Sequence, residues 1–296
     1  MTQKKLRFAL FGKEYPTEKQ AGIGRVLQSL QEKGADIWID SPFADFIEQE
    51  GLVGDIAFNR FEGYDFEADF AISIGGDGTF LKTASRAAGK QIPLFGVNMG
   101  RLGFLADVQP TEIEASLDAV YSGAYELAHH SMIQVESEGE PITEYPYALN
   151  DIAVLKRDSA SMISIRTEVS GEYLATYQAD GLIVSTPTGS TAYSLSNGGP
   201  IIVPQTGTIC LTPVAPHSLN IRPIVLPDNV EVRLSVASRS HNFLVAIDGR
   251  SEKLAQGTSI VIRKAPFCTQ IVKHGGRQYF STLREKMMWG KDEREL

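Results

Sequence analysis

The sequence changes character near residue 124, and the parts before and after this point indicate two different kinds of sheet. Before it, short apolar runs alternate with amphipathic segments long enough to form helices. Alternation of strand and helix is typical of a parallel sheet that helices cover on both faces. The expected strands are 6–12, 35–40, 69–74 and 92–97, and the expected helices are 17–33, 80–88 and 111–121.

After residue 124 the apolar runs are short, rich in Val, Ile and Thr, and separated by turn residues. This pattern favours a mostly antiparallel sheet in two packed layers. A polar segment, 282–289, is expected to form a helix that packs back on the first part of the chain. The expected strands are 131–137, 148–155, 163–169, 173–177, 182–185, 230–236, 243–247 and 259–262.

The sequence therefore predicts two domains. The first is an α/β N-terminal domain with a parallel, Rossmann-like sheet, and the second is a mainly antiparallel β C-terminal domain, a two-layer β-sandwich. The expected boundaries are 1–124, 125–275 and, for the C-terminal segment, 276–296. The active site is expected in the interdomain cleft, where ligand sites commonly lie.

Composition argues against several classes of partner. A net charge of −8 disfavours nucleic acids and acidic membranes, since both need a basic face. No run approaches the roughly 18 apolar residues of a membrane span, and the N-terminal segment lacks a signal-peptide core. Cys210 and Cys268 lie in β-patterned runs, as expected of free thiols. We therefore expect a cytoplasmic protein that binds neither nucleic acid nor membrane.

The strongest chemical signal is the segment Gly75-Gly76-Asp77-Gly78-Thr79, between an apolar strand and a helix. Its glycines allow backbone to approach a phosphate closely, and the helix start, which we expect Thr79 to cap, offers free N–H donors. It matches neither a Walker A loop nor a dinucleotide fingerprint. Asp77 would repel phosphate unless it takes a proton from an attacking hydroxyl or helps to hold a cation. The alternative is an Asp that only shapes its own turn.

A second signal is the Ser/Thr/Gly-rich segment 185–200, which follows the apolar strand Leu182-Ile183-Val184. We expect Ser190 or Thr191 to cap a short helix that Gly198-Gly199-Pro200 ends. Such a turn offers hydroxyls, amides and the Tyr193 ring to a ligand. The alternative is a Ser/Thr/Gly-rich surface loop without a binding role.

Polar residues also interrupt three apolar runs. Asn150-Asp151 lies within one expected strand, where neighbours point to opposite faces unless a bulge intervenes. Ribose hydroxyls could pair with these side chains, and a purely structural role is equally open. Asp180-Gly181 is either a bend or a functional site, and Asp248-Gly249 is more typical of a hairpin turn.

Zinc and hydrolase chemistry find little support. The five histidines show no metal-ligand spacing, and no HExxH, CxxC or GxSxG motif occurs. Only His217, in a Pro-rich turn with Asn220 and Arg222, is a candidate to lie near a pocket.

Taken together, the motifs resemble the bacterial NAD kinase (ATP-NAD kinase) family. Gly75-Gly76-Asp77-Gly78-Thr79, Leu149-Asn150-Asp151 and the segment from Asp180 to Ser196 stand in the family's order and spacing. The resemblance spans nearly the whole chain. The first motif is shared with lipid kinases and the phosphofructokinase-like group, whereas the last is highly specific.

This resemblance implies a phosphorylation of NAD to NADP by ATP. Asp77 would accept the proton of the 2′-hydroxyl of the adenosine ribose as that oxygen attacks the γ-phosphate. Gly78 would lie with Asp77 at the junction of NAD and phosphate, and Lys82 would lie near a phosphate. Asn150 and Asp151 would bind the dinucleotide.

The same resemblance implies further contacts and partners. Asp180 would bind a ribose or the nicotinamide end. A divalent cation, Mg²⁺ in most members, would be required, and the chain would form a homo-oligomer, a dimer or tetramer. An adenosine moiety would be bound by Thr191, Ala192, Tyr193, Ser194, Leu195 and Ser196.

Two positions depart from the family, in which Glu is frequent at position 151 and Gln at position 250; here these are Asp151 and Arg250. Two rival functions stay open on sequence alone. One is a kinase for lipids or other small alcohols built on the same glycine loop, although no amphipathic membrane helix is evident. The other is a non-catalytic NAD or NADP sensor.

Overall fold

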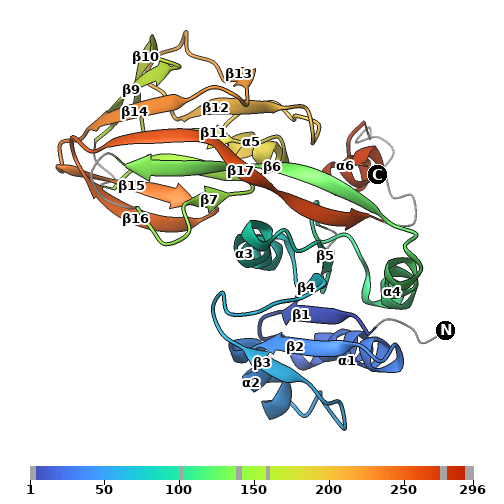
Figure 1. The fold of residues 1–296 in the computed structure, drawn as a ribbon. Helices are drawn as coiled ribbons and strands as arrows, with labels where there is room; N and C mark the ends of the chain where they lie inside the picture. Colours follow the sequence, from blue (N-terminus) through green and yellow to red (C-terminus); the bar gives the residue numbers. More distant parts are fainter. Residues whose placement is uncertain (1–4, 101–102, 138–141, 158–160, 274–278, 291–296) are drawn as a thin grey trace. The chain divides into compact units, whose positions relative to one another are not determined.

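The protein was analysed as a computed structural model that describes residues 5–100, 103–137, 142–157, 161–273 and 279–290. The chain divides into two compact units (Figure 1), which are described separately below. The first unit is Met1–His129 with Thr269–Leu296, and the second is His130–Cys268.

The first unit is built on a parallel sheet. Its strand order is β3-β2-β1-β4-β5, and every neighbouring pair is parallel. All five residues of β4 and all four of β5 are buried, so the centre of the sheet is covered on both faces. The strands are β1 Arg7–Phe11, β2 Asp36–Asp40, β3 Asn59–Phe61, β4 Phe70–Ile74 and β5 Leu94–Val97. The predicted α/β domain with a parallel sheet is confirmed.

Helices of the first unit bury apolar side chains against this sheet. One core cluster joins Phe8 and Ile72 of the strands with Ile23, Phe43 and Leu117 of three helices. The helices are α1 Thr17–Glu32, α2 Ser41–Gln49, α3 Asp77–Ala87, α4 Ile113–Ser122 and α6 Tyr279–Met287, with short 3₁₀ turns at Ala88–Lys90 and Pro110–Glu112. None of the described helices is long and apolar enough to cross a membrane.

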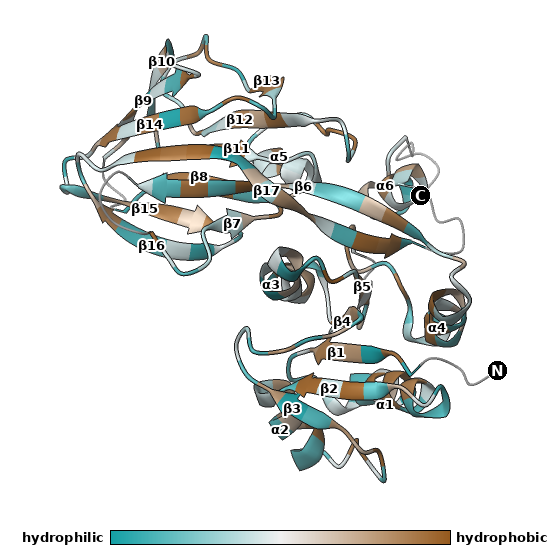
Figure 2. Ribbon diagram, viewed as in Figure 1, coloured by the Kyte–Doolittle hydropathy of each residue, from teal (hydrophilic) through white to brown (hydrophobic). Residues whose placement is uncertain are grey.

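The second unit consists of two antiparallel layers. One has the order β10-β9-β14-β17 and the other β13-β12-β11-β8-β15-β16. Figure 2 shows a hydrophobic stretch along β17 of the first layer. A single buried cluster contains Ile165 and Leu234 from one layer and Val154, Leu182 and Val245 from the other. The predicted two-layer antiparallel domain is therefore confirmed.

The strands of this unit are β8 Asp151–Lys156, β9 Ile163–Val169, β10 Glu172–Ala179, β11 Gly181–Ser185, β12 Thr208–Val214, β13 Ile224–Pro227, β14 Val232–Ala237, β15 Asn242–Ile247 and β16 Arg250–Ala255. Two short helical turns, Thr188–Thr191 and α5 Tyr193–Ser196, follow β11, and the short strand β7 Tyr147–Ala148 pairs with β6. The strands β6 Glu126–Ser137 and β17 Ser259–Lys273 run without interruption through the points where the units divide. No turn marks those points, and the sequence pattern put its boundaries at 124 and 275 instead.

Neither cysteine takes part in a disulfide. Cys210 is buried in β12 and Cys268 is half-buried in β17. This agrees with the prediction made from their positions in β-patterned runs.

Candidate active site

The glycine-rich segment of the first unit is a tight turn between β4 and α3. The helix starts at Asp77, its N-cap is Gly76 in an extended conformation, and no side chain caps it. The prediction that Thr79 caps this helix is therefore wrong. Thr79 lies inside the first turn, where its side chain hydrogen-bonds Tyr15.

The glycines of this turn play different roles. A methyl group at Gly75 would overlap the side chain of Thr79, so Gly75 is needed for the chain to pack on itself. A methyl group at Gly76 or Gly78 would meet no atom within 4 Å. Open space over an N-terminal helical turn with unpaired N–H groups suits the approach of an anion.

Asp77 is bound to a loop that follows β5. Its Oδ1 accepts the backbone N–H groups of Leu105 (3.0 Å) and Ala106 (3.1 Å), and its Oδ2 accepts that of Phe104 (3.0 Å). The ammonium of Lys286, on α6, donates to Oδ2 at 3.0 Å. Burial by itself raises the pKa of Asp77, but these N–H groups and the charge of Lys286 outweigh it and hold the pKa below its ordinary value. The carboxylate is therefore ionised at neutral pH.

The loop that receives Asp77 is itself well anchored. Asn98 donates its side-chain amide to the carbonyl of Ala106 at 3.1 Å, and Lys273 binds Asp107 at 2.6 Å. A methyl group at Gly103 would overlap Oδ1 of Asp77, so only glycine permits this approach. Sequence reasoning missed this loop and Lys286, because neither carries a motif and both are far from Asp77 in the sequence.

Lys82 lies on α3, one turn after Gly78, and its residue is exposed. Its ammonium has no ion-pair partner among the residues that the structure describes. It is free to contact a ligand that approaches the glycine turn.

In the second unit, two segments converge on the chain at Leu149–Asp151, the turn at Asp248 and the segment Thr186–Gly189. The strand predicted over 148–155 is broken here: β7 ends at Ala148 and β8 begins at Asp151. The alternation rule for neighbouring strand residues therefore does not apply to Asn150 and Asp151. Both side chains are buried, with 9% and 7% exposure.

Asp248 fixes this break in the strand. It lies between β15 and β16, as the predicted hairpin turn, with φ 46°. Its carboxylate accepts the backbone N–H groups of Leu149 and Asn150 at 2.8 Å and of Asp151 at 3.1 Å. Burial raises the pKa of Asp248 although these three donors oppose it. The sequence indicated the turn but not this interaction.

The segment after β11 is attached to the same place. Thr186 donates its hydroxyl to the carbonyl of Leu149 (2.5 Å) and its N–H to that of Asn150 (2.9 Å). Gly189 packs so closely on the Asn150 backbone that a methyl group there would overlap the carbonyl. Thr188 and His130 are hydrogen-bonded through Oγ1 and Nδ1 at 2.8 Å. His130, which sequence reasoning set aside, therefore supports the predicted binding segment.

The structure thus brings Asn150 and Asp151 together with the Thr186–Gly189 turn. Oδ1 of Asn150 is buried and has no hydrogen-bond partner among the described residues. Burial, and next the negative charge of Asp248, raise the pKa of Asp151 to about 7. An acceptor without a partner, beside a carboxyl that forms no ion pair with any described residue, suits a ligand that brings hydroxyl donors.

The predicted helix cap in the next segment is wrong. Ser190 and Thr191 belong to the 3₁₀ turn Thr188–Thr191, and α5 begins after Ala192 without a side-chain cap. The hydroxyl of Ser190 instead binds the backbone of Ile202, because it points inward.

The adenosine-binding residues implied by the resemblance differ in exposure. Ser194 is fully buried and its hydroxyl is bonded to Thr212 at 2.8 Å. Tyr193 is 38% exposed, Ser196 is exposed, and Thr191, Ala192 and Leu195 are half-buried. A ligand can therefore reach the Tyr193 ring more readily than the Ser194 hydroxyl.

Asp180 and Arg250 have structural partners of their own. Asp180 lies where the chain passes from β10 to β11, and it binds Lys156 at 2.7 Å. Arg250 donates to the carbonyls of Tyr145 (3.2 Å) and Tyr147 (2.9 Å). Arg250 thus ties β16 to the segment that leads into Leu149, and this explains an arginine at a position where the family often has Gln.

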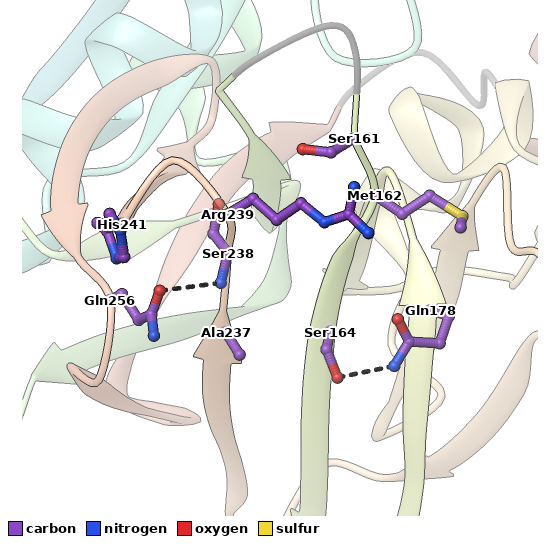
Figure 3. A pocket seen from close by; sticks show the side chains of 9 residues that line it. All are labelled: Ser161, Met162, Ser164, Gln178, Ala237, Ser238, Arg239, His241 and Gln256. Carbon is purple, nitrogen blue, oxygen red and sulfur yellow. Dashed lines mark hydrogen bonds between the residues drawn. The ribbon is translucent and has the colours of Figure 1, made fainter.

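A cavity of about 500 Å³ opens elsewhere in the second unit (Figure 3). Ser164 and Gln178 face each other across one wall of this cavity, joined by a hydrogen bond of 2.9 Å. None of the predicted site residues lines it, nor does His217. Its lining is Ser161, Met162, Ser164, Gln178, Ala237, Ser238, Arg239, His241 and Gln256.

Comparison with known proteins identifies the family of the chain. Residues 57–125 match the family model of the ATP-NAD kinase N-terminal domain, and residues 149–274 match that of the ATP-NAD kinase C-terminal domain. The chain is 52% identical over 289 residues to an NAD kinase of Bacteroides fragilis, covering 98% of this chain and 100% of that protein. It is 41% identical over 284 residues to an NAD kinase of Porphyromonas gingivalis, covering 96% and 98%.

Solved structures share the fold. Yeast NADH kinase complexed with NADH superposes with a TM-score of 0.90 at 22% identity, over 100% of this chain and 91% of that chain. An NAD kinase from Archaeoglobus fulgidus in complex with ATP superposes with a TM-score of 0.73 at 24% identity, over 96% and 99%. With both family models matched in order and relatives aligned over almost their full length, the chain belongs to the ATP-NAD kinase family.

Proposed function

We propose that this enzyme is an NAD kinase, which transfers the γ-phosphoryl group of ATP to the 2′-hydroxyl of the adenosine ribose of NAD. The products are NADP and ADP. The observation that carries this proposal is an ionised Asp77 held at the open start of α3, in a chain of this family.

Asp77 is proposed as the proton acceptor. The O–H bond of the ribose hydroxyl breaks and its proton passes to the Asp77 carboxylate. The ribose oxygen forms a bond to the γ-phosphorus, and the bond from that phosphorus to the oxygen it shares with the β-phosphate breaks. Such transfers depend mainly on alignment and on neutralising charge. The N–H groups at Gly76 and Gly78 are proposed to receive phosphate oxygens, and the open space beside the α-carbons of both glycines supports this.

The other residues are proposed to bind and orient the substrates. Asn150 and Asp151 are proposed to accept hydrogen bonds from hydroxyl groups of the dinucleotide, which the unsatisfied Oδ1 of Asn150 and the burial of the Asp151 carboxyl support. Tyr193, as part of the adenosine-binding segment 191–196, is proposed to stack on a base, and Asp180 to bind a ribose. Lys82, exposed on α3, is proposed to contact a phosphate.

The family implies a kinase that depends on a divalent cation, and we propose Mg²⁺. Among the described residues, no three His, Cys, Asp or Glu side chains lie close enough to form a metal cage. Both oxygens of Asp77 already accept two donors each. The residues therefore fit an ion that arrives with ATP, because Mg²⁺ commonly keeps water and phosphate oxygens as ligands. It would supply charge neutralisation.

Cytoplasmic location and assembly into a homodimer or homotetramer stay predictions. Light scattering on the purified chain tests the assembly. A monomer that is active at nanomolar concentration would remove the need for a second copy.

The test of the function is to incubate the protein with NAD, ATP and Mg²⁺ and to measure NADP with an NADP-specific dehydrogenase. In the variant Asp77→Asn, turnover should fall by about 10²–10⁴-fold while the Kd for NAD changes little, since the amide keeps the shape but takes no proton. The control is Asp118→Asn, a surface carboxylate on α4 that pairs with Lys33. Near-normal turnover in folded Asp77→Asn would contradict the role of Asp77. Phosphorylation of diacylglycerol or sphingoid bases, with no NADP formed, would contradict the function itself.

A further inference from the structure

The hydrogen bonds of Asp77 leave no acceptor position for a substrate. A carboxylate offers about four lone-pair positions, and Asp77 accepts two donors on each oxygen. A ribose hydroxyl can bind Asp77 only by replacing one of these donors. The identity of the donor that leaves then determines how the site works.

Three of the four donors are held in place by the fold. They are the backbone N–H groups of Phe104, Leu105 and Ala106, in the loop anchored by Asn98 and by the Asp107–Lys273 ion pair. Releasing any of them would require the loop to move away from the Asp77 carboxylate. A buried backbone N–H that loses its partner costs about 1–3 kcal/mol.

The fourth donor, Lys286, is free to adjust. It sits near the end of α6 on a flexible stem with three rotatable protons, and its side chain is 32% exposed. Its ammonium lies 4.6 Å from the ring centroid of Phe104, and the ring of Tyr279 lies 6.3 Å from the same ring. The contact with the Phe104 ring keeps the ammonium near Asp77 even when its hydrogen bond is broken.

The geometry points to Lys286 as a positioning residue for the phosphoryl transfer: its ammonium keeps Asp77 charged and aimed, and its hydrogen bond is the one that the ribose hydroxyl replaces. This inference rests on the proposed role of Asp77. Lys286 acts through that carboxylate and not on the transferred group.

The charges around Asp77 make the consequence specific. Burial is the largest influence on the pKa of Asp77 and acts to raise it, while Lys286 acts against burial both by its charge and by its hydrogen bond. Asp107, on the same loop, is already paired with Lys273. Removing the ammonium therefore raises the pKa of Asp77, so that the carboxylate takes up its proton at a higher pH than in the parent protein.

The experiment compares Lys286→Met with Lys286→Arg and with Arg284→Met. Arg284 lies on the same helix and is exposed, so its replacement removes an equal charge from α6 without touching Asp77. The acidic limb of the kcat profile should move to higher pH in Lys286→Met by about one unit, which is on the order of tenfold lower kcat at a pH below the pKa of Asp77 in both proteins. Lys286→Arg should return the acidic limb to its position in the parent, and Arg284→Met should have the same profile as the parent. In Lys286→Met the KM for NAD should change less than kcat.

A second measurement does not depend on activity. The Asp77 carboxyl carbon, assigned by its loss in Asp77→Asn, is titrated by NMR in protein labelled with ¹³C-aspartate. Its pKa should be higher in Lys286→Met than in the parent. If the parent forms no NADP at all, the proposed function fails, whereas the titration still tests Lys286.

Three outcomes would overturn the inference. One is an unchanged Asp77 titration and acidic limb in a folded Lys286→Met protein. Another is higher kcat in that variant, which would make Lys286 a block on the site. The third is an equal loss of kcat in Arg284→Met, which would show that Lys286 contributes only as one of the positive charges on α6.

Discussion

Asp151 is the most informative place to test the electrostatics of the second unit. Its carboxyl is buried beside Asp248, and the pKa in the folded chain is raised from 3.8 to about 7, first by burial and then by the charge of Asp248. In the unfolded chain Asp151 has its ordinary pKa. As pH rises from about 4, the unfolded chain therefore loses this proton first, and the folded state holds more protons until about pH 7.

The sign of the effect follows from linkage, since stability falls with rising pH wherever the folded state binds more protons. A difference of 7 − 3.8, about 3 pKa units, corresponds to about 4 kcal/mol at 1.36 kcal/mol per unit. Asp151→Asn is neutral at every pH and nearly the same in shape. It should unfold with the parent's free energy, within about 1 kcal/mol, at pH 4, and should be more stable by on the order of 4 kcal/mol at pH 8.

The assay is calorimetric or circular-dichroism melting of Asp151→Asn and the parent from pH 4 to pH 8.5, without nucleotides. At pH 8 the transition of the second unit should rise by roughly 10 °C. Glu172→Gln serves as the control, because Glu172 is exposed on β10 of the same unit. A difference between Asp151→Asn and the parent that stays constant from pH 4 to pH 8, or a parent that is the more stable at pH 8, would refute the reasoning.

Two further predictions concern the supports of the site. Gly103→Ala should lower turnover by at least about 100-fold with little loss of NAD affinity. Its methyl group would push Oδ1 of Asp77 away from the N–H groups of Leu105 and Ala106. Measurements of NADP production and of NAD binding check this, and unchanged turnover would contradict it. Asp248→Ala should destabilise the second unit by about 3–5 kcal/mol, since three buried N–H groups lose their acceptor. Urea unfolding measures the stability of Asp248→Ala, and a loss of less than about 1 kcal/mol in the free energy of unfolding would show that other groups hold Leu149–Asp151 in place.

Local patterns in the sequence predicted the elements of the fold well where neighbouring residues determine them. The apolar run at 69–74 and the alternating run at 163–169 became β4 and β9 almost residue for residue. The helix α2 was missed because Ser41-Pro42 reads as the end of a strand, whereas Pro in a first helical turn is equally at home. The sequence pattern put the boundaries at 124 and 275, whereas the units divide within β6 and β17, which continue through those points without a turn.

The candidate site was predictable in its motifs but not in its contacts. Three segments are recognisable from unusual residues within a few positions of one another: Gly75–Thr79, Asn150-Asp151 and the segment after β11. What fixes them lies far away in the sequence: Lys286 is 209 residues from Asp77, and Asp248 is 98 residues from Asn150. Neither partner carries a local pattern, since a lysine on a polar helix and an Asp-Gly turn are both ordinary. Only the fold reveals that one restrains Asp77 and the other holds three N–H groups.

The glycines show why a glycine-rich motif, read without a structure, is weak evidence for a bound ligand. A methyl group at Gly75 or Gly189 would collide with the chain itself, at the Thr79 side chain and the Asn150 carbonyl. Self-packing is sufficient to require glycine at both positions, so neither is evidence for a phosphate. Gly76 and Gly78 differ, because no atom of the described chain comes within 4 Å of a methyl group there. The fold would tolerate a side chain at these two positions, so self-packing does not require glycine there, and the space beside them leaves room for the phosphate of the proposed reaction.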